Sequence, residues 1–220
     1  FATRVDKAIE KGVKWLKEKQ IKDGPEAGSW GGVEDQPLYG GGRGGHPNKI
    51  GITALALYAL LACDVPPNDP VITRGFNFIY ENIEKLKACT YERGAILLAL
   101  EALADARVKE KFRRARKRLP RNLRNTKSYL RKKEQSFVKK QVAWLCSFQS
   151  SRGGWRYGEN FAPPGGYNED VSATQFALLG LKSASRMGFK VPDEVFRRAA
   201  EYNLEAQQKE GPRARRLEGR

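Results

Sequence analysis

A repeated pattern of about 60 residues constrains the fold of this chain more than any other feature. The stretches KGVKWLKEKQ (11–20) with GSW (28–30), and QVAWLCSFQSSRGGW (141–155), share an apolar helical run, a Gln and then a Gly-x-Trp. Weaker copies occur at RGFNFI (74–79) and AAEYNLEAQQKEG (199–211). One such repeat is too short to bury its apolar face alone, so neighbouring repeats must stack on one another.

The spacing of apolar residues predicts two kinds of helix in alternation. The amphipathic helices are expected at residues 4–20, 69–86, 136–149 and 191–208, and the buried ones at 51–65, 91–105 and 170–188. In the amphipathic segments apolar residues recur every three or four positions, whereas the buried segments are apolar on nearly every side. No segment has the pattern of a strand, so we predict an all-α protein. Each repeat is then a hairpin of one outer and one inner helix.

The repeats define equivalent residues. Aligning the outer helices groups Gly12, Gly75, Gln141 and Ala200, and eight positions later Gln20, Gln149 and Gln208. Aligning the inner helices places TALALYAL (53–60) against TQFALLGL (174–181). We therefore expect these residues to occupy matching places in successive hairpins.

The charge of the chain is concentrated in two segments. The formal net charge is +16, and residues 107–140 hold 16 Lys and Arg against only Glu110 and Glu134. The tail 209–220 is also basic, while the remainder is close to neutral. Residues 107–140 have few apolar side chains and contain Pro120, which predicts a protruding or partly ordered insert, with two short helices that meet near Pro120 as one arrangement. Such an insert would contact an anionic surface, but no nucleic-acid motif is present, so no specific nucleic acid is predicted.

The cysteines and the chain start add little about function. Cys63, Cys89 and Cys146 have no Cys-x-x-Cys spacing, so we expect small core residues and neither a disulfide framework nor a zinc knot. No apolar run approaches the roughly 20 residues that span a bilayer. The sequence selects no compartment, although a signal peptide preceding Phe1 would mean export.

The Gly-x-x-Trp-Leu-x-x-x-Gln run followed by Gly-x-Trp resembles the QW repeat of squalene-hopene and oxidosqualene cyclases, and the helical hairpins of protein prenyltransferase β subunits. The resemblance covers most of the chain except residues 107–140 and the tail. It implies a partial α/α toroid of about three and a half hairpins, a single domain over 1–220, with parallel inner helices around a cavity. An open arc leaves an apolar flank, so we expect further repeats, self-association or a protein partner to complete the toroid.

The resemblance also suggests where chemistry would lie. Cyclases of this type protonate an alkene with an Asp of the motif Asp-x-Asp-Asp-Thr, and DVSAT (170–174) is the matching segment. Asp170 and Thr174 fit the motif, but Ser172 and Ala173 replace the other two acids. Asp170 is the only candidate catalytic residue, and it can equally be the N-cap of a helix.

The sequence indications of a metal site or a ligand site are weaker. The prenyltransferases hold zinc with Asp, Cys and His, but His46 is the only histidine and no Cys is suitably spaced, so we predict no metal and no cofactor. Loop residues at the rim of a toroid could bind a ligand or only pack the loops: Tyr39, Arg43, His46, Tyr157 and Tyr167. The repeat residues Gln20, Trp30, Gln149 and Trp155 are predicted to be structural. Each Gln would bond backbone groups at a helix end, with the Trp stacked on its amide.

Two functions remain open from the sequence. The first is a non-catalytic binding or scaffold module that takes an apolar or isoprenoid-like ligand or a protein partner. The alternative is an isoprenoid-processing enzyme of the cyclase or prenyltransferase type, with its catalytic acids outside this chain. The missing acids at positions 172 and 173 favour the first, and fold alone does not decide.

Overall fold

The computed structural model describes residues 2–31, 49–85, 89–120, 122–157 and 169–207. These residues form seven α-helices and one 3-10 turn, and none of them lies in a strand, so the all-α prediction is confirmed. The helices are α1 (Ala2–Lys19), α2 (Lys49–Ala62), α3 (Pro70–Asn82), α4 (Thr90–Arg114), η1 (Thr126–Tyr129), α5 (Lys132–Phe148), α6 (Val171–Met187) and α7 (Asp193–Ala206).

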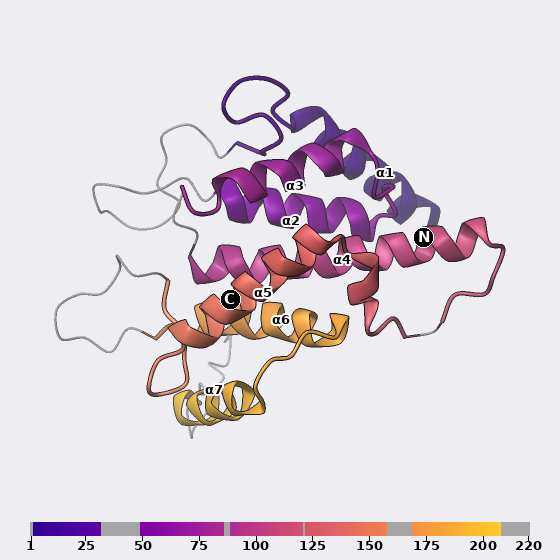
Figure 1. Cartoon of the computed structure of the whole chain (residues 1–220). Coiled ribbons are helices and arrows are strands. Elements are labelled where there is room, and N and C mark those ends of the chain that lie inside the picture. Colours follow the sequence, from indigo (N-terminus) through magenta and orange to yellow (C-terminus); the bar gives the residue numbers. More distant parts are fainter. Residues whose placement is uncertain (1, 32–48, 86–88, 121, 158–168, 208–220) are drawn as a thin grey trace, which may run out of the picture.

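The helices form two layers. In Figure 1 the inner helices α2, α4 and α6 lie one below another in that order, and α5 crosses in front of α4 and α6. Helix α4 packs against both α2 and α6, while α3 packs on α2, α5 on α4 and α6, and α7 on α6. The alternation of outer and inner helices predicted from the apolar pattern is therefore present.

The inner helices run in the same direction. At one end, the Tyr91 hydroxyl at the start of α4 donates to Asp170 at the start of α6 (3.1 Å). At the other end, Arg186 of α6 pairs with Glu101 of α4 (2.9 Å). Glu92 at the start of α4 also bonds the backbone of Gly51 at the start of α2, and Asp64 after α2 pairs with Lys109 near the end of α4 (2.9 Å). All three helices thus begin at the same end of the molecule.

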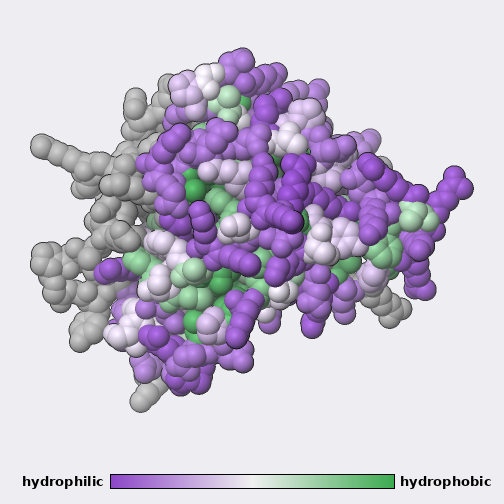
Figure 2. All heavy atoms as spheres, viewed as in Figure 1, coloured by the Kyte–Doolittle hydropathy of each residue, from purple (hydrophilic) through white to green (hydrophobic). Residues whose placement is uncertain are grey.

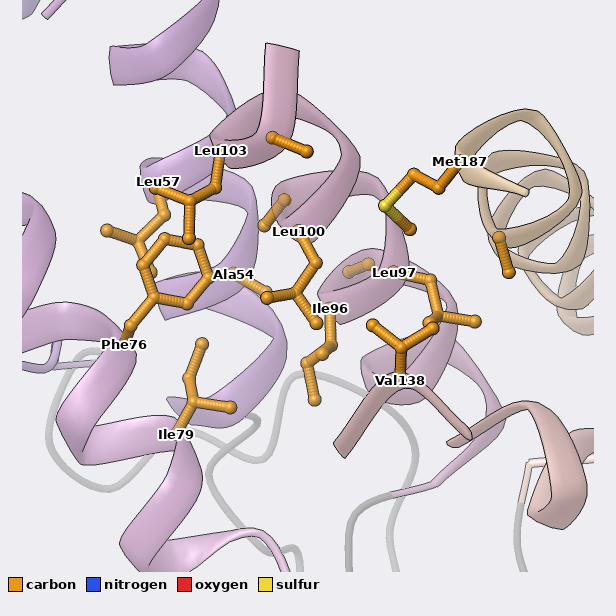
Figure 3. Close-up of a cluster of buried hydrophobic side chains, with 14 of the residues drawn as sticks. Ala54, Leu57, Phe76, Ile79, Ile96, Leu97, Leu100, Leu103, Val138 and Met187 are labelled. Carbon is orange, nitrogen blue, oxygen red and sulfur yellow. The ribbon is translucent and has the colours of Figure 1, made fainter. Parts of the chain in front are cut away.

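The core lies between the two layers (Figure 3). Phe76 and Ile79 of α3 and Val138 of α5 are buried against the inner helices, where Leu97 of α4 and Met187 of α6 are fully buried. Burial of one such side chain stabilises the fold by about 1.5–3 kcal/mol. Helices α3 and α5 are therefore held mainly through their apolar stripes.

Helix ends follow the local sequence. Asp69 caps α3 by accepting a hydrogen bond from Val71 N (2.9 Å), with Pro70 at the first helical position as predicted. Gly188 ends α6 at φ 93°, a left-handed conformation that favours glycine. No helix within the described residues is both long and apolar enough to cross a membrane.

The basic segment 107–140 differs from the predicted insert. Helix α4 continues to Arg114 and α5 begins at Lys132, so much of the segment is helix. Arg107 and Glu134 join the two helices by an ion pair (2.6 Å), and Leu130 is buried. Lys, Arg and Glu are good helix formers, so a shortage of apolar residues did not end α4. Pro120 does lie outside the helices.

Helix α1 is the least covered outer helix. Ile9 is 46% exposed, whereas Ile72 and Val138, which occupy the same position in α3 and α5, are fully buried. Helices α3 and α5 each pack on the inner helix that precedes them, and no described helix precedes α1. Among the described helices none covers α1 on this side, and Val5 and Ile9 of its predicted apolar stripe are exposed, while Val13 and Leu16 pack against the core.

The alignment of the last repeat is wrong by one residue. Ala199 and Tyr202 of α7 are buried like Gly75 and Phe78 of α3, whereas Leu204 is exposed. Gln207, rather than Gln208, follows α7 as Gln149 follows α5, with nearly the same backbone angles (φ −68°, ψ 125° and φ −63°, ψ 127°). Spacing alone could not fix the register, because the described part of α7 has no Gly-x-Trp to anchor it.

Candidate functional site

The predicted Gln residues join successive repeats. Each side-chain amide donates to a glycine carbonyl in its own loop and to a valine carbonyl in the first turn of the next outer helix. The bonds are Gln20 Nε2 to Gly28 O (3.0 Å) and Val71 O (2.8 Å), and Gln149 Nε2 to Gly153 O (2.9 Å) and Val195 O (2.9 Å). Each Gln therefore bridges to the following hairpin. The prediction was a bond to backbone groups left free at a helix end, and the bonded groups are carbonyls of the loop and of a first helical turn.

The predicted Trp residues bind the helix ends instead. Each indole Nε1 donates to a carbonyl in the last turn of the preceding outer helix, and each Trp backbone N donates to a Thr of the following inner helix. The bonds are Trp30 to Leu16 O (2.8 Å) and Thr53 Oγ1 (3.2 Å), and Trp155 to Leu145 O (2.8 Å) and Thr174 Oγ1 (2.9 Å). Carbonyls in the last turn have no partner within the helix, so the indole supplies one.

The loop glycines allow the close approach of the next repeat. Gly28 and Gly153 have φ 95° and 94°. A Cβ at Gly28 would lie 2.8 Å from the carbonyl carbon of Arg74, and one at Gly153 would lie 2.6 Å from that of Arg198. Only glycine fits both the backbone angle and the space. The geometry of both loops fits a structural role for the Gln-Gly-Trp pattern.

The second repeat lacks this pattern and is held by Arg93. This buried side chain of α4 donates to Gln141 Oε1 of α5 (2.5 Å) and lies over the Trp144 ring at 4.3 Å from its centre. It also pairs with Glu84 (3.9 Å). A cation that stacks on an indole and bonds an amide can link an inner helix to the next outer helix.

Asp170 lies in a polar cluster at the start of α6. Its carboxylate Oδ1 accepts hydrogen bonds from Ala173 N (2.7 Å), Ser172 Oγ (2.5 Å) and the Tyr91 hydroxyl (3.1 Å). The Tyr91 ring lies 5.3 Å from that of Tyr157 and 5.0 Å from that of Phe176. The geometry is that of an N-cap with two additional hydroxyl donors.

The electrostatics of Asp170 oppose proton donation. Partial burial raises the pKa of its carboxyl, but the hydrogen bonds from Ser172, Ala173 N and Tyr91 outweigh burial, and the pKa lies below its usual value. A cyclase acid must instead stay protonated near neutral pH, which needs a raised pKa. Asp170 is therefore an ionised cap.

The inner helices expose apolar side chains away from the outer layer. Tyr58 of α2 and Leu179 of α6 occupy the same position in the inner-helix alignment, and each is 42% exposed. Leu55 is also exposed, about 160° around α2 from Leu57, which packs on the outer helix α3 at Gly75. Contrary to the expected burial on all sides, α2 and α6 thus present an apolar face, which also includes half-buried Leu98 of α4.

Two carboxylates, Glu101 and Asp105, lie beside this face in the middle of α4. Glu101 pairs with Arg186, and Asp105 lies one turn further along α4. Burial, together with the charge of Glu101, raises the pKa of Asp105 to about 6, although Arg186, Lys109 and a hydrogen bond with Thr126 oppose the rise. The sequence analysis did not identify Asp105. An acidic residue in an otherwise apolar helix was the signal that could have identified it.

Asp105 should make stability depend on pH. Because its pKa is higher in the folded state than the unfolded value of about 3.9, the folded state binds more protons between about pH 4 and 6. Stability from this group therefore falls as pH rises through that range. We expect Asp105→Asn to raise the free energy of unfolding by about 1–2 kcal/mol at pH 7 and by little at pH 4. Thermal unfolding of both proteins across this range would test it, and parallel curves would contradict it.

Only one of the loop residues predicted to line the rim of a toroid lies within the described part of the chain. Tyr157 lies near Asp170 through Tyr91, whereas Tyr39, Arg43, His46 and Tyr167 lie outside the described residues. Tyr91 was missed, although its place in the first turn of a preceding inner helix is the kind of signal that could have identified it. Among the described residues, no three His, Cys, Asp or Glu side chains come together as a metal site requires.

Comparisons with protein families, with curated proteins and with solved structures found no match. The resemblance to the cyclases and prenyltransferases therefore stays a prediction, as does closure of the helices into a toroid.

Proposed function

We propose that this chain is a helical-repeat binding module whose inner layer takes up a ligand with an isoprenoid-like apolar chain. What supports the proposal is the exposure of Tyr58 and Leu179, which hold one position in two repeats on a side that none of the described outer helices covers. Solvent-facing positions of a helix are normally polar, so apolar residues at a repeated position favour a binding surface.

The neighbouring side chains suit such a ligand. Leu55 and Leu98 extend the apolar face along α2 and α4, and the Glu101–Arg186 pair supplies polar groups at one end. Ligand sites commonly combine an apolar lining with a few polar groups that fix orientation.

The alternative of an isoprenoid-processing enzyme has less support. It would need a protonated acid or a metal, and the lowered pKa of Asp170 disfavours the first. Cyclised or transferred product from squalene or prenyl diphosphates, abolished by Asp170→Asn, would overturn the non-catalytic proposal.

Binding of a fluorescent farnesyl probe, followed by polarisation, tests the proposed face. We expect the double variant Tyr58→Lys/Leu179→Lys to bind at least about tenfold more weakly, because burial of even one such side chain is worth about 1.5–3 kcal/mol. Leu204→Lys changes a side chain exposed on the outer helix α7 and should leave binding unchanged. Equal losses in both variants, or no binding by the parent chain, would contradict the proposal.

A further inference from the structure

The end of the molecule where α2 and α4 finish carries a groove with an apolar floor. It has a volume of about 460 Å³ and lies between the turn after α2 and the last two turns of α4. Its apolar lining is Val65, Pro66, Pro67, Ala106, Phe112 and Leu119. Lys109, Arg113 and Lys117 line the same groove, so an apolar surface and several cations meet there.

The carboxylates around this groove are already paired. Asp64 pairs with Lys109 (2.9 Å) and Glu110 pairs with Arg114. Arg113 and Lys117 are exposed and have no carboxylate partner within the described ranges of the chain, and the same holds for Arg116 and Arg118. The positive charge at this end is therefore available to an external anion.

The chain reverses sharply after α4. Lys117 N donates to Phe112 O (3.0 Å), Arg116 N donates to Arg113 O (3.1 Å), and Arg116 adopts φ 50°. These bonds close the helix end and carry the chain on to Leu119, which lines the groove and is 38% exposed. An exposed leucine thus lies among the cations. Figure 2 shows this end of the molecule, at the right, as a mainly hydrophilic projection.

We propose that this end of the molecule docks on a membrane surface rich in anionic lipids. Arg113, Arg116, Lys117 and Arg118 bind the lipid phosphates, and Leu119 enters the acyl region. A polybasic cluster together with an apolar residue is the combination that holds proteins at such surfaces. This inference goes beyond the proposed ligand binding and uses none of its residues.

The observations favour a lipid surface over a nucleic acid. Bases of a single strand stack on exposed aromatic rings. The two aromatic residues nearest the cluster, Phe112 and Tyr129, are only partly exposed, and Lys111 lies over the Tyr129 ring at 5.2 Å. An exposed leucine contributes nothing to phosphate binding but contributes directly to insertion.

Sedimentation with vesicles tests the proposal. The parent chain should bind vesicles of phosphatidylcholine with phosphatidylglycerol and not vesicles of phosphatidylcholine alone. Arg113→Glu/Lys117→Glu should weaken binding by about thirtyfold or more, since each cation near such a surface contributes about fivefold. Leu119→Asn should weaken it by about tenfold, with the remaining binding lost at high salt.

A matched control separates docking from general attraction. Lys139→Glu/Lys140→Glu makes the same change of charge within the same basic segment. These lysines are exposed on α5, which runs back from the Arg107–Glu134 pair toward Leu97, away from the groove. We expect its effect to be less than about threefold. Equal losses in the two charge variants would overturn the proposal, as would RNA binding as tight as vesicle binding together with no effect of Leu119→Asn.

Discussion

Trp155→Ala should lower the free energy of unfolding by about 3–5 kcal/mol. The Trp155 ring is fully buried, and its Nε1 donates to Leu145 O at the end of α5 (2.8 Å). The substitution leaves a large cavity and also leaves a buried carbonyl without its partner. Urea unfolding followed by circular dichroism gives the value directly.

Two further variants separate packing from hydrogen bonding. Trp155→Phe keeps an aromatic ring but removes the donor, so we expect a loss of about 1–3 kcal/mol. Trp15→Ala removes a ring that is 56% exposed and should change stability by less than about 1 kcal/mol. If Trp155→Ala lowered the free energy of unfolding by less than about 1 kcal/mol, the loop that contains Trp155 would not be holding the helices together.

Gly94→Ala should destabilise the protein by about 1–2 kcal/mol. A Cβ at Gly94 would meet the backbone carbonyl of Phe176, 2.8 Å from its carbon, and a Cβ at Gly180 would lie 2.7 Å from the Gly94 Cα. These contacts are with backbone, so α4 and α6 would have to move apart, and overpacking of this kind typically costs about 1–3 kcal/mol. The higher helix propensity of alanine offsets at most about 1 kcal/mol.

Gly12→Ala provides the matched control for this prediction. Gly12 also lies within a helix, α1, but a Cβ there would have no neighbour within 4 Å. We therefore expect a gain of up to about 1 kcal/mol from helix propensity alone. Chemical denaturation of both variants should give opposite signs, and a gain in Gly94→Ala would contradict the close packing of the inner helices.

The sequence pattern predicted part of the contacts that join successive hairpins. The recurrence of Gln and Gly-x-Trp identified Gln20, Trp30, Gln149 and Trp155 as one kind of residue, and the structure gives both pairs the same four kinds of bond. The partners could not be predicted, because Val71 and Val195 belong to the next repeat. Arg93 links α4 to α5 in the second repeat, but it is not part of the repeated motif, so the sequence pattern did not identify it.

The candidate sites were less predictable from the sequence than the contacts between hairpins. Asp170 was found through its motif, and the hydrogen bonds that lower its pKa come first from the neighbouring Ser172 and Ala173 N, and then from Tyr91, which is remote in sequence. Tyr58 and Leu179 were expected inside buried helices, but each is 42% exposed on a side that no helix of the described residues covers. The groove at Leu119 combines residues that follow α2 with residues from the last turns of α4 and the segment after it.

By itself, the sequence determined the all-α class, the alternation of helix types and the repeat, because apolar spacing and helix propensity are local properties of a chain. The tertiary structure decided which residues meet, as where the inner helices α4 and α6 pack closely at Gly94 and Gly180. It also decided that α4 continues into the basic segment and that α1, α2 and α6 have exposed apolar faces. These depend on which helices stack on one another, and that is fixed by contacts between residues far apart in the chain.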